Sequence, residues 1–280
     1  MSSLLYHYTN AAGIYGMLKD YDEETHPYLT MWATNASFLN DSSEFSFGKE
    51  ICKEAFQSYE QQMGIEESKC IGYAFSNYDK FAVKKKINST PCIISLSKTI
   101  NNASMWAMYS ADGSGIAIIL DPIELKEIQY TFLKPCFYCD NADSLLNEKN
   151  YLEEIEDVYN HFISLKIDGL PESDSELRKF CIASCIITEL APCIKHSAYQ
   201  YENEFRLIVQ GIDKPKFRVR KDIIIPYKEV LVPIKAVKGF VIGPTANYDY
   251  MFSSLETFLA SKGLSSLDEC IVKSEVPYRG

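Results

Sequence analysis

Short runs of apolar residues, many of them β-branched or aromatic, recur along the chain between polar turns, and such runs predict β-strands. Residues 115–120, Gly-Ile-Ala-Ile-Ile-Leu, are apolar almost without a break, which is typical of a strand buried on both faces. The segment 201–209 begins with charged residues and ends in Leu-Ile-Val, so a strand is also expected there. The predicted strands cover residues 4–9, 28–33, 91–96, 115–120, 132–138, 201–209, 230–234, 236–242 and 271–274.

Helical patterns separate these strands. Asp41 followed by Glu44 has the spacing of a capping box, so a helix is expected from there to about residue 63. Two further helices, over 141–167 and 173–190, follow each other and end at a proline, which disfavours helix in the residue before it. We interpret this pair as an α-helical insertion at about 141–192. The remaining predicted helical segments are 10–19, 104–109 and 248–262.

Strands and helices do not alternate regularly, so the order of elements indicates the α+β class rather than a chain of βαβ units. The chain has 280 residues, of which 46% are hydrophobic, and this is enough for one large domain with a sizeable core. Residues 1–280 are therefore predicted to form a single domain that carries the helical insertion.

The formal net charge is −10, which disfavours non-specific nucleic-acid binding because that binding depends on basic surfaces. The first residues contain neither the charged region nor the long apolar run of a signal peptide. No segment approaches the roughly 18 apolar residues that span a membrane. We expect a cytoplasmic protein with no membrane partner, whose nine cysteines are reduced thiols.

The charged segment 201–206, Tyr-Glu-Asn-Glu-Phe-Arg, carries the most chemical information. In a strand every second side chain points the same way, so Glu202, Glu204 and Arg206 would share one face. Two carboxylates at this spacing raise each other's pKa unless a cation intervenes. Taken alone, the pattern favours a solvent-exposed ion ladder, worth about 0–1 kcal/mol, over a binding or catalytic site.

Other residues suit ligand binding but also have simpler explanations. His7, in the predicted first strand, could contact a ribose hydroxyl, although a partly buried histidine bonded to backbone is more frequent. Trp106 and Tyr109 are three residues apart on one helix face and could clamp a planar ring, although a core aromatic pair is more common. Asn40 and the two acids of the capping box could bind a cation or a ribose, and capping explains those acids more simply.

Metal-binding patterns are weak in this chain. Cys136-x-x-Cys139 is the single CxxC motif, and no second pair of ligands with zinc spacing accompanies it. The four histidines are scattered at positions 7, 26, 161 and 196. No zinc site is therefore expected.

Two clusters of basic residues stand out against the acidic net charge. Lysines 84–86 form a charge run that is typical of a solvated face. Arg218 and Arg220, with Lys216 and Lys221 nearby, form a second cluster that is suited to attract phosphate. Simple surface placement is the default explanation of this second cluster.

Several short motifs follow one another in a fixed order from one end of the chain to the other. They are Leu5-Tyr6-His7-Tyr8-Thr9, Phe38-Leu39-Asn40-Asp41 with Glu44, Ser95-Leu96-Ser97, Met105-Trp106-Ala107-Met108-Tyr109 with Gly115 and Asp121, Lys195-His196, Tyr201-Glu202-Asn203-Glu204-Phe205-Arg206, Ile242-Gly243-Pro244 and Val276-Pro277-Tyr278-Arg279. Through these motifs the chain resembles a widespread bacterial family of uncharacterised proteins, domain-of-unknown-function family 2971. That family name implies no function.

More distantly, the chain resembles ADP-ribosyltransferase-like proteins, which carry a His or Arg in the first strand, a Ser or Tyr in a middle strand and a late Glu-x-Glu. This resemblance implies a core of small, mixed and mainly antiparallel sheets with helices alongside, and NAD as a co-substrate. It implies Glu204 and Glu202 as catalytic residues. The nucleotide-binding residues that it implies are His7, Tyr8, Thr9, Ser95, Ser97, Trp106, Tyr109 and Arg206.

The resemblance also implies a role for each of these groups. Cleavage of the nicotinamide–ribose bond develops oxocarbenium character, which the carboxylate of Glu204 would stabilise. Glu202 would orient or deprotonate the acceptor. His7 would hold a ribose, and an aromatic residue of the 105–109 motif would stack on nicotinamide. Arg206, which departs from the pattern of the group, would tune the acidic pair or hold it in place.

The leading hypothesis is an enzyme that uses NAD, either transferring ADP-ribose to a protein or nucleic-acid acceptor or hydrolysing NAD. By analogy, such an enzyme could serve as a bacterial toxin or defence effector. The alternative is a non-enzymatic module that binds a nucleotide or a partner protein. A third hypothesis, a nuclease using Asp41, Glu44 and Glu202, requires a divalent metal, whereas the first two require none. The geometric test of the leading hypothesis is whether Glu204 faces His7.

Overall fold

The structure is a computed structural model that describes residues 4–41, 43–66, 70–72, 75, 90–162, 175–209, 214–220 and 222–277. At 161–162 and 175–178 only the backbone is described. The lysine run at 84–86 and the facing ends of the two predicted insertion helices lie outside the described residues.

The chain forms two compact units, each assembled from separate stretches of sequence. The first unit consists of Met1–Thr34, Cys92–Pro135 and Tyr201–Gly280, and the second of Asn35–Pro91 and Cys136–Gln200. The helices of the predicted insertion group with the earlier stretch in the second unit. A single domain over residues 1–280 stays a prediction.

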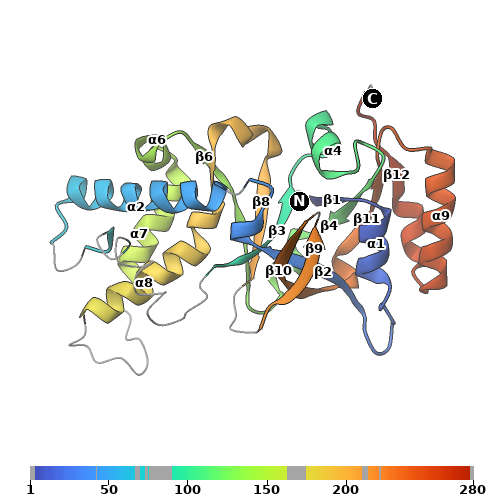
Figure 1. Cartoon of the computed structure of the whole chain (residues 1–280), viewed down its shortest axis with the longest axis horizontal. Coiled ribbons are helices and arrows are strands. Elements are labelled where there is room, and N and C mark those ends of the chain that lie inside the picture. Colours follow the sequence, from blue (N-terminus) through green and yellow to red (C-terminus); the bar gives the residue numbers. More distant parts are fainter. Residues whose placement is uncertain are drawn as a thin grey trace. The chain divides into compact units, whose positions relative to one another are not determined.

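A ten-stranded sheet forms the framework of the first unit (Figure 1). Its strands are β1 (Leu5–Thr9), β2 (Tyr28–Asn35), β3 (Cys92–Ser97), β4 (Ile116–Leu120), β5 (Thr131–Pro135), β8 (Glu204–Val209), β9 (Lys216–Arg220), β10 (Ile223–Pro233), β11 (Val237–Ile242) and β12 (Ile271–Lys273). The main path runs β12-β11-β4-β1-β3-β2-β10-β9, and β8 pairs with β3 and β5 off this path. β11 and β12 are parallel, whereas β1–β3, β1–β4, β3–β8 and β5–β8 are antiparallel.

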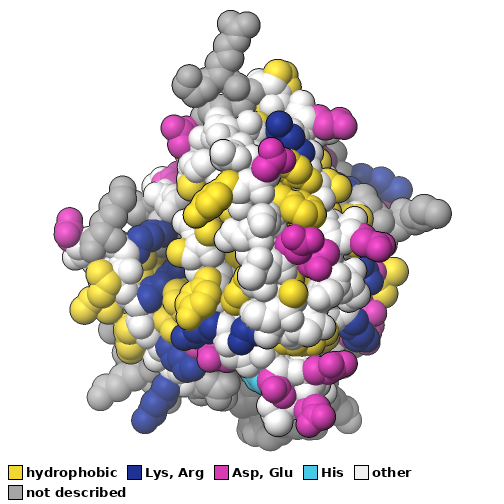
Figure 2. Space-filling model, turned by 90° about the vertical axis from the view of Figure 1, so that its right-hand side faces the viewer, with side chains coloured by type: hydrophobic (Ala, Val, Ile, Leu, Met, Phe, Trp, Pro, Cys, Tyr) yellow, Lys and Arg dark blue, Asp and Glu magenta, His cyan; other side chains and the backbone are white. Residues whose placement is uncertain are grey.

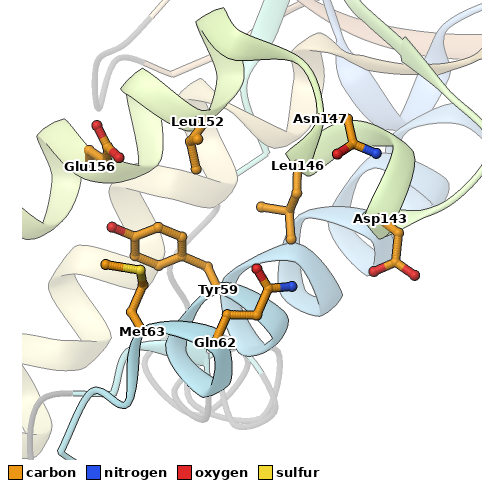
Figure 3. Close-up of a pocket in the computed structure, with 8 residues that line it drawn as sticks. All are labelled: Tyr59, Gln62, Met63, Asp143, Leu146, Asn147, Leu152 and Glu156. Atoms are coloured by element: carbon orange, nitrogen blue, oxygen red, sulfur yellow. The ribbon is translucent and has the colours of Figure 1, made fainter.

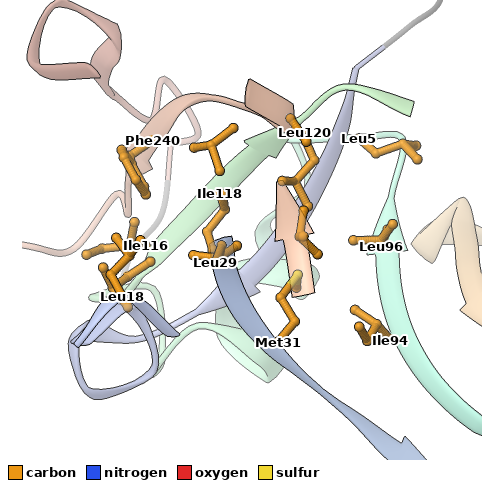
Figure 4. Close-up of a cluster of buried hydrophobic side chains, with 14 of the residues drawn as sticks. Leu5, Leu18, Leu29, Met31, Ile94, Leu96, Ile116, Ile118, Leu120 and Phe240 are labelled. Atoms are coloured by element: carbon orange, nitrogen blue, oxygen red, sulfur yellow. The ribbon is translucent and has the colours of Figure 1, made fainter. Parts of the chain in front are cut away.

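β4 lies between β1 and β11 and is buried on both faces, as its apolar sequence predicts. Ile118 of this strand is fully buried and packs in a large hydrophobic core with Leu5 and Phe240 (Figure 4). Helices α1 (Ala11–Leu18) and α9 (Tyr248–Ser261) contribute apolar residues to the same core. This core covers one face of the sheet, and a smaller hydrophobic cluster that includes Tyr8, Trp106 and Val241 lies on the other.

Asparagine side chains begin several helices of the first unit, because their carbonyl oxygens accept hydrogen bonds from unpaired backbone N–H groups. Asn10 caps α1, Asn102 caps α4 (Ala103–Tyr109) and Asn247 caps α9. Asp121 caps the short helix α5 (Pro122–Lys126) in the same way. The expected helices at 10–19, 104–109 and 248–262 are confirmed.

The second unit is mainly helical and contains α2 (Glu44–Met63), α6 (Ala142–Leu146), α7 (Lys149–Phe162) and α8 (Ser175–Glu189). The same unit also contains a parallel pair of short strands, β6 (Phe137–Cys139) and β7 (Ile194–His196). Gly48 lets α2 approach the main chain of Ala191, because a Cβ there would lie 2.2 Å from the Ala191 carbonyl oxygen. A glycine inside this helix therefore permits close packing.

The α+β class with a mainly antiparallel sheet is confirmed. The predicted strand 201–209 is wrong at its start, because residues up to Glu202 belong to the 3-10 helix η4 (Ser197–Glu202). Other strands also differ from the prediction: the expected strand 132–138 is divided between β5 and β6, and β7 was not predicted. β9 was interpreted only as a basic cluster, and β10 begins seven residues before the predicted segment 230–234. Pro226 interrupts the apolar pattern of β10 and hides its length.

Within the described part of the chain, no helix is both long enough and apolar enough to cross a membrane. Figure 2 shows one face of the molecule, on which acidic and basic side chains both occur among small groups of apolar ones. No field of a single sign covers this face, although the net charge is −10.

Shortening the Ile118 side chain of β4 tests how much the large hydrophobic core contributes to stability. Ile118→Ala should lower the free energy of unfolding by about 2–5 kcal/mol, because it opens a cavity among fully buried side chains. Ile123→Ala, at a side chain that is 59% exposed, should change it by less than about 0.5 kcal/mol. Urea denaturation followed by circular dichroism measures both variants, and equal losses would contradict the assignment of β4 to the core.

Candidate functional site

The sheet face that points away from the large core brings several of the predicted residues together. Tyr6 lies opposite Ser97 in the β1–β3 pair, and Ser97 lies opposite Glu204 in the β3–β8 pair. Residues directly opposite each other in antiparallel strands share a face. Tyr8, two residues along β1, is on the same face and meets Trp106 edge-on at a ring-centroid distance of 4.9 Å. We call this side of the sheet the carboxylate face.

Glu204 and Arg206 form a bidentate ion pair on β8. Nε and a terminal nitrogen of Arg206 donate to the two carboxylate oxygens of Glu204, at 3.0 and 3.1 Å. The side chains are only 5% and 2% exposed. The solvent-exposed ion ladder that the residues alone favoured is therefore wrong.

Glu202 is held beside this pair by different partners. Its Oε1 accepts a hydrogen bond of 2.7 Å from the hydroxyl of Tyr109, and its carbonyl oxygen accepts one of 2.6 Å from Oγ of Ser97. Between the two glutamates, Asn203 has a φ of 44°, in the left-handed region that asparagine tolerates better than most residues. The turn at Asn203 ends the 3-10 helix and starts β8, so Glu202 and Glu204 do not belong to one strand.

Helix α4 and the loop before it fix this arrangement. The side-chain amide of Asn102 donates to the carbonyl of Tyr201 at 2.8 Å, while its oxygen caps α4. Trp106 is fully buried, and its indole N–H donates to the carbonyl of Ile100 at 2.9 Å. Trp106 is thus a core residue in this conformation, whereas Tyr109 directs its hydroxyl to a candidate catalytic carboxylate.

His7 is not brought together with Glu204. The alternation of β1 places Leu5, His7 and Thr9 on the face opposite Tyr6 and Tyr8, and His7 lies opposite the core residue Ile118. Nδ1 of His7 donates to the carbonyl of Ser95 at 3.0 Å. Burial lowers the pKa of His7, and the bond to Ser95 opposes that shift. A neutral histidine bonded to backbone is the arrangement that its sequence context favoured.

A second polar cluster lies in the second unit and includes a residue that the sequence interpretation missed. Lys195 is 3% exposed, and its Nζ lies 3.5 Å from Oε2 of Glu44. Tyr199 donates to Asp41 at 3.3 Å, and the Lys195 ammonium lies 5.3 Å from the centre of the Tyr199 ring. Locally, the apolar Ile194 before Lys195 is the only indication of burial, and this is too weak to predict a buried lysine from the sequence.

The predicted capping box at the start of α2 is wrong. Ser43 occupies the cap position and makes no side-chain cap bond. Asp41 instead accepts hydrogen bonds from the hydroxyl and the backbone N–H of Ser43, and these bonds lower the pKa of Asp41. Glu44 pairs with Lys195 rather than with the helix cap, so both acids serve the polar cluster of the second unit.

A pocket of about 480 Å³ opens between α2, α6 and α7 in the second unit (Figure 3). None of the residues predicted to bind NAD lines it. Its walls combine apolar, amide and acidic side chains, namely Tyr59, Gln62, Met63, Asp143, Leu146, Asn147, Leu152 and Glu156.

The cysteines carry no metal-site geometry in the described residues, where no three His, Cys, Asp or Glu side chains gather to hold a metal ion. Cys136 and Cys139 are both buried. Burial raises the pKa of Cys139 to about 12, so its thiol stays protonated at neutral pH. The same effect raises the pKa of Cys52 to about 12 and that of Cys92 to about 11.

Comparison with known families adds one finding to this geometry. A family model described as "Protein of unknown function (DUF2971)" matches residues 105–207. The match includes Trp106, Tyr109, Glu202, Glu204 and Arg206, which all contribute to the network around the carboxylate face. No curated protein and no solved structure matches the chain significantly, so no comparison supports the ADP-ribosyltransferase resemblance.

Replacement of Arg206 tests how much the Glu204–Arg206 ion pair contributes to the free energy of unfolding. Arg206→Met should lower the free energy of unfolding by about 3–5 kcal/mol, because it leaves the Glu204 carboxylate buried without its bidentate partner. Lys149→Met breaks a pair with Glu153 whose side chains are 86% and 57% exposed, and should cost less than about 1 kcal/mol. Urea denaturation measures both, and a cost for Arg206→Met no larger than that of the control would show that Glu204 does not depend on Arg206.

Proposed function

We propose that the protein is an enzyme that cleaves the nicotinamide–ribose bond of NAD, either transferring ADP-ribose to an acceptor or hydrolysing NAD. The observation that carries the proposal is the burial of two glutamates, Glu202 and Glu204, in one Glu-Asn-Glu segment. Burying a carboxylate is costly unless it is paired and hydrogen-bonded, so two buried carboxylates in one short segment suggest a functional site. The distant resemblance to ADP-ribosyltransferase-like proteins supplies the reaction class, but not the role that it implies for His7, which lies on the opposite face of the sheet from Glu204.

The contacts of the two glutamates suggest different roles. Arg206 holds both oxygens of Glu204 in a fixed orientation, which preorganises a negative charge for the oxocarbenium-like transition state. Glu202 accepts one hydrogen bond from Tyr109, and we assign to it the orientation or deprotonation of the acceptor or of water. Because Glu202 and Glu204 are at most 5% exposed, the proposal requires that the side chains covering them move when NAD binds.

A non-enzymatic module that binds a nucleotide or a partner protein is the second candidate. It is favoured by the same bidentate ion pair, because a carboxylate that a guanidinium already neutralises is a weaker base and stabilises a cation less well. The nuclease hypothesis has no comparable support, since no cluster of metal ligands occurs among the residues described, and we do not propose it.

Nicotinamide release from labelled NAD distinguishes the two candidates. The wild type should release nicotinamide, and Glu204→Gln should reduce the rate about 10²–10³-fold, because the amide keeps the size of the side chain but removes its charge. Glu202→Gln should reduce acceptor-dependent transfer or hydrolysis as well. Glu256→Gln, at an exposed position of α9, is the matched control and should keep the wild-type rate.

Each other result selects between the candidates. Equal rates for the wild type and Glu204→Gln would remove Glu204 from catalysis. If calorimetry detects NAD binding that Glu204→Gln weakens, while neither the wild type nor any variant releases nicotinamide, the binding module is correct and the enzyme is not. If NAD neither binds nor reacts, neither candidate holds in its nucleotide-dependent form.

A further inference from the structure

A cluster of aromatic and basic side chains occupies the end of the sheet formed by β2, β10 and β9, which Figure 1 shows side by side. Trp32 of β2 and Tyr227 of β10 have ring centroids 4.8 Å apart. The guanidinium carbon of Arg218, on β9, lies 5.4 Å from the centre of the Trp32 ring and 6.0 Å from that of Tyr227. The two rings are tilted by 37° to each other, and the three strands thus contribute one planar group each to a single cluster.

The strand register explains why these side chains meet. Arg218 lies opposite Ile225 on β10, and Tyr227 follows two residues later on the same face of that strand. Tyr227 in turn lies opposite Thr34 of β2, and Trp32 precedes Thr34 by two residues. The cluster of Trp32, Tyr227 and Arg218 therefore lies on one face of the sheet. Its arrangement is determined by the pairing of the strands, not by a mobile loop.

The guanidinium of Arg218 has few partners for its charge among the described residues. A terminal nitrogen of Arg218 donates to the neutral hydroxyl of Thr34 at 2.8 Å, whereas its buried Nε has no hydrogen-bond partner among the described residues. Burial lowers the pKa of Arg218, and the like charge of Arg220 lowers it further. Glu229, an acid on the same face, pairs with Lys216 at 2.6 Å.

A half-buried guanidinium with an orphaned N–H is costly unless an anion completes its hydrogen bonds. Arginine binds phosphate well because its planar fork can donate two parallel hydrogen bonds. The adjacent Trp32 is 40% exposed and offers a surface on which a further planar ring can stack. The cluster thus offers one group that can bind an anion, Arg218, and one that can bind a planar ring, Trp32.

We infer that Trp32, Arg218 and Tyr227 form a binding site for a nucleoside phosphate, with the phosphate on Arg218 and the base against Trp32. Arg220 adds a second positive charge beside the phosphate position. The net charge of −10 opposes a long polyanion, so the ligand class is a small nucleotide and not a nucleic acid. The site shares no residue with the network of Glu202, Glu204 and Arg206 and does not depend on the reaction proposed there.

Tryptophan fluorescence provides a direct measurement of this site. The chain has two tryptophans, of which Trp32 is 40% exposed and Trp106 is fully buried. A base that stacks on Trp32 should quench its emission and leave that of Trp106 unchanged. Titration of the full chain with ADP, adenosine and inorganic phosphate therefore separates the contribution of the phosphate from that of the base.

We expect saturable quenching by ADP at lower concentrations than by adenosine, and weak competition by inorganic phosphate. Arg218→Gln should weaken ADP binding at least about tenfold, because it removes a charged hydrogen-bond donor. Lys126→Gln, which removes one positive charge at an exposed position of α5, should leave ADP binding unchanged. Glu204→Gln should also keep the response, so failure at this site is distinguishable from failure at the carboxylate face.

Three results would overturn the inference. They are the absence of saturable quenching by ADP in the wild type, competition by inorganic phosphate at the same concentration as ADP, and an unchanged ADP affinity in Arg218→Gln. Circular dichroism checks that this variant is folded. If it is not, Arg218→Lys decides, because it keeps the charge but loses the fork: a reduced ADP affinity supports the site and a wild-type affinity overturns it.

Discussion

The burial of the Glu204–Arg206 ion pair constrains the arrangement of the first unit more than any other single interaction. Removing a carboxylate and a guanidinium from water is unfavourable unless both are fully engaged. β8 is an interior strand, paired with β3 on one side and β5 on the other, and the Glu204 and Arg206 side chains on it are 5% and 2% exposed. The position of β8 in turn places Glu202 within reach of α4, so sheet order, helix position and carboxylate geometry depend on one another.

The fold class and the interior elements could be predicted because local patterns determine them. The apolar run of β4 and the capped helix α9 occur within about a residue of the expected segments. The errors arise where distant contacts override the pattern. β10 continues through Pro226, and the segment before Glu204 turns at Asn203 because Ser97 and Asn102 hold its carbonyl groups.

The candidate site was predictable in its residues but not in its environment. The Glu-Asn-Glu-Phe-Arg sequence identifies the charged groups, yet exposed ladders and buried pairs have the same spacing, and the tertiary structure around β8 decides between them. His7 shows the same limitation: one step along a strand reverses the face, so proximity in a motif does not imply proximity in space. The ion pair of Lys195 with Glu44 and the contact of Arg218 with Trp32 join residues over a hundred positions apart, and no local pattern reveals them.

The distribution of buried thiols has a practical consequence for the two units. Cys92 lies in the first unit and Cys52 in the second, and burial raises their pKa values to about 11 and about 12. Reagents that attack thiolates therefore modify each cysteine only after its surroundings open. The labelling rate of Cys92 therefore reports the opening of the first unit, and that of Cys52 the opening of the second. The ratio of the two rates indicates whether the units open together, as one cooperative unit, or separately.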